Sequence, residues 1–244
     1  FEGAIKEGTY SLEIDVAMTI DNKIVVIHDH SVDRTSNGSG FVEEMTLAQL
    51  EALDFGAWFA PKFRGTPIMT LQELIHWAIK NQAGLVVEVK QRQRRYEFLA
   101  ELKKLLDSIP FAYGYTQLLA FDHPLMVHAK EIMPRVKTQV VTIARYCNHL
   151  EAITHSRADF VCIEYPHANE DDLRAFKKAG LGIRLYFQPN DEGLHPIEHL
   201  RLKYGGDVKA DVIRWMKEGL LDMISHDDIS MLKALAHEAG LEPV

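Results

Sequence analysis

A chain of 244 residues with 47% apolar and 25% charged residue types can bury a substantial core, which excludes a disordered tail, a collagen-like repeat and a disulfide-stapled miniprotein. Its 27 Lys and Arg residues against 35 Asp and Glu residues give a formal net charge of −8, which argues against a broad nucleic-acid-binding face. The length suits two small domains or one (β/α)8 barrel, so the order of elements along the chain has to decide.

From residue 11 onward, short β-rich runs alternate with longer segments of helical spacing. This alternation is typical of repeated βα units around a parallel sheet. Several of the β-rich runs are almost continuously apolar, as expected of strands covered on both faces. We predict strands at residues 12–19, 24–28, 84–90, 116–121, 138–143, 159–165, 182–187 and 221–225. We predict helices at residues 71–81, 96–109, 124–132, 150–155, 171–179, 208–218 and 229–239.

Residues 30–66 show no clean βα alternation, so we interpret them as an insertion after the second strand. The Asp21-Asn22 pair is a tight-turn signal, so the second strand is expected to pair with the first in a hairpin rather than add a barrel strand. On that count seven barrel strands remain, and we expect the missing first strand to precede Phe1. The predicted fold class is therefore α/β, a TIM (β/α)8 barrel, with residues 1–244 forming a single domain.

Two acidic residues share one face of the first predicted strand. The two-residue period of a strand places Glu13 and Asp15 together, with Leu12, Ile14 and Val16 on the other face. Their Cβ atoms are expected roughly 6–7 Å apart, within reach of one hard cation. A solvated polar face on an edge strand is the alternative interpretation.

Glu88 and Lys90 repeat this arrangement on another strand, amid valines. A third carboxylate and a fixed ammonium at the carboxyl ends of strands form a cation site beside an anion site, which suits a phosphate oxygen held between metal and lysine. A simple ion pair between Glu88 and Lys90 is the alternative. The basic run at residues 91–95 either attracts an anionic substrate or forms a solvated loop.

His28 lies where the second predicted strand meets a loop. An imidazole in such a place can donate a proton to a leaving alkoxide, a step that unassisted phosphodiester cleavage lacks. Asp29 either orients this histidine or caps the turn. A histidine that only satisfies the hydrogen bonds of a turn is the alternative interpretation.

Taken in order, these motifs resemble the glycerophosphodiester phosphodiesterase family over about the first ninety residues. The resemblance implies a TIM-barrel hydrolase in which residues 30–66 are the family's insertion. It implies that Glu13, Asp15 and Glu88 bind a divalent metal, that His28 is a general acid/base and that Lys90 contacts phosphate. The motifs are Leu12-Glu13-Ile14-Asp15-Val16, Val26-Ile27-His28-Asp29, Asp33-Arg34-Thr35-Ser36-Asn37-Gly38-Ser39-Gly40, Leu53-Asp54-Phe55-Gly56, Pro67-Ile68-Met69-Thr70-Leu71 and Val87-Glu88-Val89-Lys90.

The chain departs from the family pattern at both ends. The family's His-Arg-Gly segment, which carries a second catalytic histidine, does not occur from Phe1 onward, and we expect it upstream of that residue. Near the C-terminus, Tyr186 and Phe187 stand where the family has a Trp-Thr strand, and we expect them to wall an alcohol pocket. Glu164 and His226 also fall at predicted strand ends, where they either face the site or serve a loop.

The function predicted from the sequence is metal-dependent hydrolysis of glycerophosphodiesters to glycerol 3-phosphate and an alcohol, with one Mg²⁺ or Ca²⁺ ion as cofactor. The alternatives are lysophospholipase D-type activity on a related lipid, or a non-catalytic phosphodiester-binding barrel if the His-Arg-Gly segment is truly absent. The expected partner is a small-molecule substrate rather than nucleic acid. No apolar run reaches the ~18 residues of a membrane helix, so we expect no stable membrane insertion. We expect a cytoplasmic location, and the oligomeric state is left open.

Overall fold

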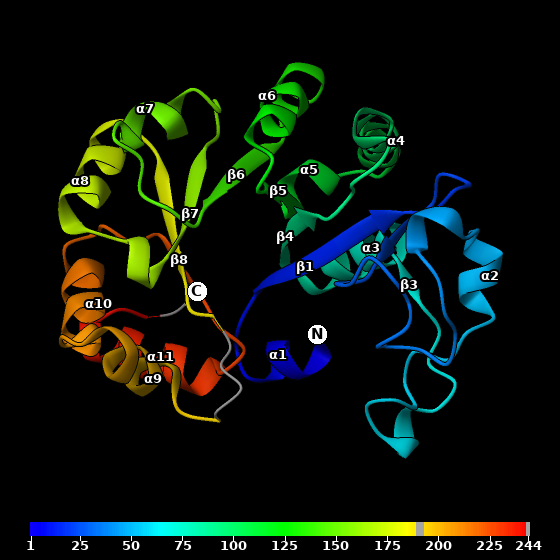
Figure 1. Ribbon diagram of the computed structural model, residues 1–244, viewed down its shortest axis with the longest axis horizontal. Helices are drawn as coiled ribbons and strands as arrows, with labels where there is room; N and C mark the ends of the chain where they lie inside the picture. The colour runs from blue at the N-terminus through cyan, green and yellow to red at the C-terminus, as the bar shows by residue number, and fades with distance from the viewer. Residues whose placement is uncertain (189–192, 243–244) are drawn as a thin grey trace. The chain divides into compact units, whose positions relative to one another are not determined.

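The computed structural model describes residues 1–188 and 193–242 (Figure 1). Contacts divide the chain into two compact units. The first unit comprises Ser11–Ala120 and His128–Lys137. The second unit comprises Phe1–Tyr10, Phe121–Val127 and the described residues from Thr138 onward. Each unit is an α/β structure of its own.

The first unit is built on a sheet with the strand order β3-β2-β1-β4-β5. β1 pairs in parallel with β4, and β4 pairs in parallel with β5. β2 runs antiparallel to β1, so the predicted hairpin is confirmed, and Asn22 takes the left-handed conformation that its turn requires, with φ 62°. The strands are β1 (Ser11–Met18), β2 (Ile24–Val26), β3 (Met69–Thr70), β4 (Gly84–Val89) and β5 (Thr116–Ala120).

Helix α3 (Leu71–Asn81) shows how the local sequence sets an element of this unit. Thr70 and Glu73 form a reciprocal capping box at its start, and Gln82 ends it in the left-handed region with φ 55°. Its buried residues recur every three or four positions, so one face packs on the sheet. The other helices of the unit are η1 (Val42–Glu44), α2 (Leu47–Glu51), η2 (Pro61–Phe63), α4 (Arg95–Ser108) and α5 (Ala112–Tyr115), and α6 (His123–Ile132) contributes residues to both units.

The predicted insertion, residues 30–66, carries η1, α2 and η2 and packs through its own small core. Within this fully described segment, the β-pairing is the single bridge between Ser31 and Phe41. Leu50 is fully buried at the centre of the packing. Because apolar residues of the β1–β2 hairpin join this core, the insertion is fixed to the strand that carries Glu13 and Asp15. The buried residues of the core are Ala17, Val25, Ile27, Val32, Val42, Leu50 and Ile68.

The second unit contains the parallel strand order β6-β7-β8-β9. In α8, Asn169 accepts the Asp172 backbone N–H at the N-cap, acidic residues occupy the first turn and basic residues the last, in accord with the helix dipole. The strands are β6 (Lys137–Thr142), β7 (Phe160–Glu164), β8 (Gly182–Tyr186) and β9 (Met223–Ser225). The helices are α1 (Glu2–Lys6), α7 (His149–Thr154), η3 (Tyr165–His167), α8 (Glu170–Lys178), α9 (Pro196–Tyr204), α10 (Val208–Lys217) and α11 (Ile229–Ala239).

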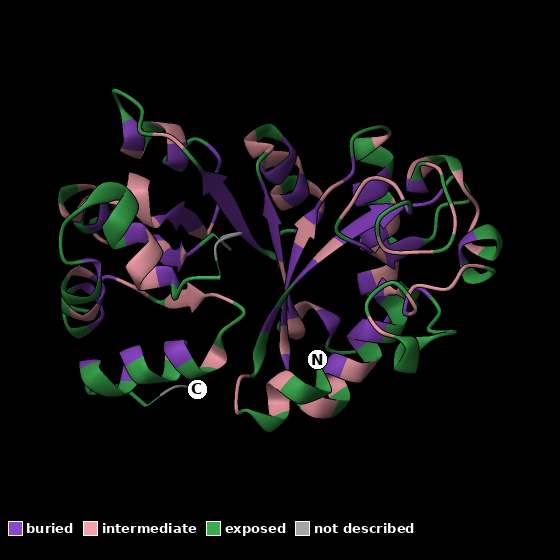
Figure 2. Cartoon of the chain, turned by 60° about the horizontal axis from the view of Figure 1, so that its bottom comes forward, coloured by how far each residue is buried: buried purple, intermediate pink, exposed green. Residues whose placement is uncertain are grey.

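Every strand and helix predicted from the sequence is present, with bounds that shift by one or two residues at most ends. Figure 2 shows the strands largely buried and the exposed residues on loops and outer helix faces. The predicted ranges did not include β3, α1, α2, α5, α9 or the 3-10 helices η1, η2 and η3. Among the described residues, no helix is both long and apolar enough to cross a bilayer.

Candidate active site

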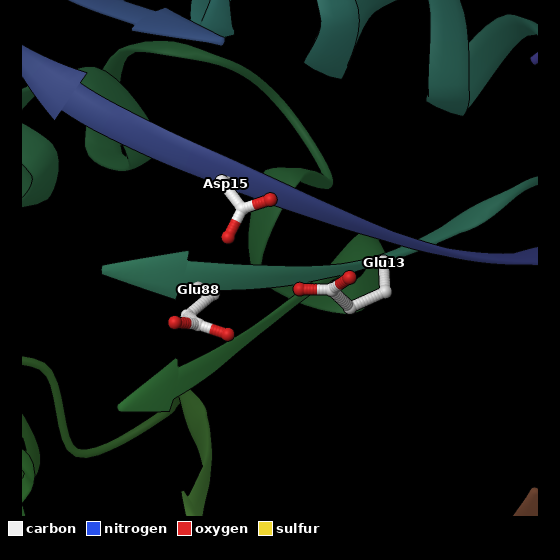
Figure 3. Close-up of side chains that lie close together, drawn as sticks. All are labelled: Glu13, Asp15 and Glu88. Carbon is white, nitrogen blue, oxygen red and sulfur yellow. The ribbon is translucent and has the colours of Figure 1, made fainter. Parts of the chain in front are cut away.

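Three carboxylates converge on one face of two neighbouring strands of the first unit, β1 and β4. β1 and β4 pair in parallel with Asp15 opposite Glu88, and Glu13 lies two residues before Asp15 on the same face. One oxygen from each of the three lies within 4.8 Å of the others, and the side chains point toward one another (Figure 3). The convergence predicted from the two-residue spacing is therefore present in the fold.

Lys90 follows β4 and reaches into this cluster. Its Nζ lies 2.6 Å from Glu88 Oε1 and 3.3 Å from Asp15 Oδ1. Burial of Lys90 disfavours its charged form, but the hydrogen bonds and charges of Glu88 and Asp15 outweigh burial and raise its pKa. The lysine therefore remains an ammonium beside the carboxylates. Glu88 and Lys90 form the ion pair that was the alternative interpretation. This ion pair is present together with the cluster of three carboxylates.

The donor set fits a divalent cation. Oxygen ligands of one Mg²⁺ or Ca²⁺ ion lie about 2.0–2.6 Å from it, so two of them can be separated by at most about 5.2 Å. The separations in the cluster satisfy this condition. The three carboxylates and one ammonium together carry two surplus negative charges, which a divalent ion balances.

His28 lies in a hydrogen-bonded series at the start of the insertion. Its Nδ1 lies 2.7 Å from Asp29 Oδ1, which leaves the second ring nitrogen available for proton transfer. The Arg34 guanidinium donates to both oxygens of Asp29, at 2.6 and 2.8 Å. These bonds from Arg34, with that of His28, hold the pKa of Asp29 well below its usual range against the opposing effect of burial. Asp29 is therefore ionised at neutral pH and is hydrogen-bonded to His28, an arrangement that suits the orienting role, one of the two predicted for it.

Residues 91–95 attach the loop after β4 to neighbouring segments, and attraction of an anionic substrate by this basic run stays a prediction. The Gln91 side chain is buried and accepts the Met18 backbone N–H at 2.6 Å. Glu43 of the insertion accepts the backbone N–H groups of Arg92 and Gln93 at 2.8 and 2.9 Å. The Arg94 guanidinium donates to the Thr19 carbonyl at 2.7 Å. The loop that carries Lys90 is thus tied to the hairpin and to the insertion.

Glu43, Gln91 and Arg34 were not among the residues predicted for the site. The sequence gives no local signal for the first two, because their partners lie 49 to 73 residues away along the chain. Arg34 lies five residues after Asp29, and an Asp-x4-Arg spacing in a loop is too common to single it out.

Tyr186 and Phe187 belong to the second unit. Phe187 is buried, its ring centroid lies 6.5 Å from that of Tyr165, and its backbone N–H donates to the Ser225 carbonyl. Tyr186 is half-buried at the end of β8, opposite Glu164 of β7 and Ser225 of β9. Burial raises the pKa of Glu164, against the lowering effect of His167 and Lys203. Phe187 is thus part of the packing of its unit, and an alcohol-binding role for the two aromatic residues stays a prediction.

The chain is similar to a known protein family and to several known proteins. The model of the Glycerophosphoryl diester phosphodiesterase family matches residues 1–231. YhdW of Bacillus subtilis is 34% identical over 187 residues, 75% of this chain and 76% of YhdW. A glycerophosphodiester phosphodiesterase of the same species is 27% identical over 215 residues, 80% of this chain and 72% of that protein.

A phosphodiesterase of Oleispira antarctica, solved in complex with the product sn-glycerol-3-phosphate, superposes with a TM-score of 0.74 at 24% identity. The superposition covers 95% of this chain and 87% of that one. This likeness confirms the α/β TIM-barrel fold class predicted from the sequence.

Proposed function

The chain belongs to the glycerophosphoryl diester phosphodiesterase family, and from that premise we propose how its own residues bind and cleave a glycerophosphodiester. The enzyme class predicted from the sequence, a phosphoric diester hydrolase acting on glycerophosphodiesters, is confirmed by the family and by the named relative. The substrate is a small molecule. The products of its hydrolysis are glycerol 3-phosphate and an alcohol.

Glu13, Asp15 and Glu88 are proposed to hold one divalent cation, Mg²⁺ or Ca²⁺. The observation that carries this proposal is the convergence of their oxygens within 4.8 Å on two strands in register. When bound, such an ion polarises a phosphoryl oxygen and stabilises the charge that develops on it. The carboxylates also set the position of Lys90, whose ammonium contacts two of them. Lys90 is proposed to contact a phosphoryl oxygen of the substrate.

His28 is proposed to act as the general acid. The ring nitrogen opposite its bond to Asp29 gives a proton to the alcohol oxygen as the P–O bond breaks, while a water molecule bonds to phosphorus through its oxygen and releases one proton to solvent. The hydrogen bond to Asp29, which Arg34 holds in place, orients the His28 ring for this transfer. Tyr186 and Phe187 remain proposed walls of the alcohol pocket.

We propose that residues 1–244 form a single phosphodiesterase domain with 30–66 as its insertion, because the family model runs across both compact units. The net charge of −8 disfavours nucleic acid as a partner. The cytoplasmic location stays a prediction, which fractionation of the source cells tests.

Metal-dependent release of glycerol 3-phosphate from glycerophosphocholine tests the assignment. In the full chain, Glu13→Gln and Glu88→Gln each remove one carboxylate charge and are expected to lower turnover by about 100-fold or more, the scale of lost electrostatic stabilisation of a transition state. Chelation is expected to abolish turnover of the unmodified chain, and added Mg²⁺ or Ca²⁺ to restore it. Glu97→Gln removes an exposed carboxylate from α4 of the same unit and serves as the matched control. Unchanged turnover in both site variants refutes the assignment.

A further inference from the structure

An exposed group of aromatic side chains lies on the insertion. We call Trp58, Phe59 and Phe63 the aromatic patch; they are 47%, 69% and 41% exposed. The Trp58 and Phe59 ring centroids lie 5.7 Å apart, and so do those of Phe59 and Phe63. Three neighbouring aromatic rings in contact with water are costly, and such clusters usually mark an interaction surface. In Figure 1 the cyan loop that carries them extends away from β3.

The loop that bears the aromatic patch is firmly built. The Phe55 backbone N–H donates to the Thr66 carbonyl at 2.8 Å and closes the loop, and Asp54 Oδ1 accepts the backbone N–H groups of Gly56 and Ala57. A Cβ at Gly56 would come within 1.8 Å of the Phe63 carbonyl oxygen, so the close approach of the two backbones requires glycine. The hydrogen-bonded backbone of the loop therefore keeps the three rings exposed to water.

The charge of this loop is opposite to that of the whole chain. Residues 54–67 contain two cations, Lys62 and Arg64, and one anion, Asp54, so the loop carries a formal charge of +1, whereas the chain as a whole carries −8. Both cations are exposed, and Lys62 Nζ lies 4.8 Å from the centroid of the Phe63 ring. Aromatic rings interleaved with Lys and Arg are the composition that binds the interface of an anionic bilayer.

We propose that this loop docks on the surface of an anionic lipid bilayer, with the aromatic patch entering the headgroup region and Lys62 and Arg64 meeting lipid phosphates. The attachment is peripheral. A projecting loop with rings at its tip fits a soft interface, where no complementary pocket is needed.

The patch is connected to the proposed acid. The Arg34 guanidinium carbon lies 5.5 Å from the Trp58 ring centroid, and the same guanidinium holds Asp29, which orients His28. Docking at Trp58 thus brings the His28 region to the membrane surface, where lipid phosphodiesters such as lysophospholipids reside. This catalytic consequence rests on the proposed function, whereas docking itself does not.

Vesicle binding by the full chain tests the proposal. We expect the chain to bind vesicles of phosphatidylcholine with phosphatidylglycerol at low salt, and to bind pure phosphatidylcholine vesicles much less. Lys62→Glu with Arg64→Glu is expected to weaken binding to the anionic vesicles by about 30-fold or more, because each cation near such a surface contributes roughly a fivefold factor. Phe59→Ser with Phe63→Ser is expected to reduce binding at least as strongly. It retains Trp58, whose emission should shift to the blue when vesicles are added to the unmodified chain but not when they are added to this variant.

Phe111→Ser is the matched control, because Phe111 is 78% exposed in the same unit but lies between α4 and α5. Phe59→Ser with Phe63→Ser should hydrolyse water-soluble glycerophosphocholine at the unmodified rate and vesicle-bound lysophosphatidylcholine more slowly. Normal vesicle binding by a chain that hydrolyses neither substrate supports docking and counts against the proposed function alone. Absence of vesicle binding, equal binding by all variants, or a dimer that dissociates in the Phe59/Phe63 variant while vesicles are ignored overturns the docking proposal.

Discussion

Asp29→Ala tests the orientation of His28 without altering the three carboxylates of the proposed metal site, because Asp29 contacts His28 and Arg34. The exposure of the side chains involved limits how far this substitution can lower the free energy of unfolding. The side chains of His28, Asp29 and Arg34 are 66%, 25% and 56% exposed, so these ion pairs are screened by water and contribute at most about 1 kcal/mol to the free energy of unfolding. A loss of that size lowers the Tm of a chain of this length by about 2–4 °C.

The effect on catalysis is expected to exceed the effect on folding. A fully buried aspartate that orients a catalytic histidine contributes about 10⁴-fold to kcat. His28 is largely exposed, and water can replace part of the lost bond, so we expect a fall in kcat nearer about tenfold, with little change in KM. The assay is glycerol 3-phosphate release from glycerophosphocholine, measured as kcat and KM across pH, beside a thermal unfolding curve.

Arg34→Ala is the companion variant, since it leaves the bond between His28 and Asp29 in place. We expect a similar change in Tm but a smaller fall in kcat than in Asp29→Ala. An unchanged kcat in Asp29→Ala, or a rise in KM alone, contradicts an orienting role. A fall in Tm far above 4 °C would instead assign Asp29 to the folding of the insertion.

Two further predictions concern stability. Leu50→Ala, at the fully buried centre of the insertion core, is expected to lower the free energy of unfolding by about 2–5 kcal/mol, measured by denaturant titration, and a loss below about 1 kcal/mol contradicts the packing described for this core. Glu164→Gln is expected to raise Tm at pH 7 and leave it unchanged near pH 4. Burial raises the pKa of Glu164 in the folded state, so folding favours its protonated form. The contribution of Glu164 to the free energy of unfolding is therefore fully present below its ordinary pKa of 4.5 and is lost as pH rises through the higher pKa of the folded state. A Tm difference that is equal at the two pH values argues against this ionisation.

Much of the fold follows from local sequence signals. The capping box at Thr70 and Glu73 and the spacing of buried residues define α3 to the residue, and the Asp21-Asn22 turn identifies the hairpin. α5 has only four residues and follows Phe111 in the left-handed region with φ 69°, a conformation that no propensity rule assigns to phenylalanine. α9 begins at Pro196 and buries only Pro196 and Leu200, so its periodic signal is weak.

The candidate site was predictable only as far as local sequence signals specify it. The two-residue spacing of Glu13 and Asp15 specifies a shared face, but the meeting of Asp15 with Glu88 depends on the β1–β4 register, which no short segment encodes. The contact of Lys90 with both carboxylates and the support of its loop by Glu43 depend on that same tertiary arrangement. Local patterns thus identified the chemical groups, and long-range pairing determines which of them touch.

The alternation along β1 also predicts where the gene can tolerate changes of length. Leu12, Ile14 and Val16 are buried on one face while Glu13 and Asp15 lie on the other. A one-codon insertion or deletion within Ser11–Met18 exchanges the two faces, so packing and ion-binding groups are lost in a single event. The Asp21-Asn22 turn lies outside that strand, and length variation among descendants of this gene is therefore expected at such loops and excluded from β1.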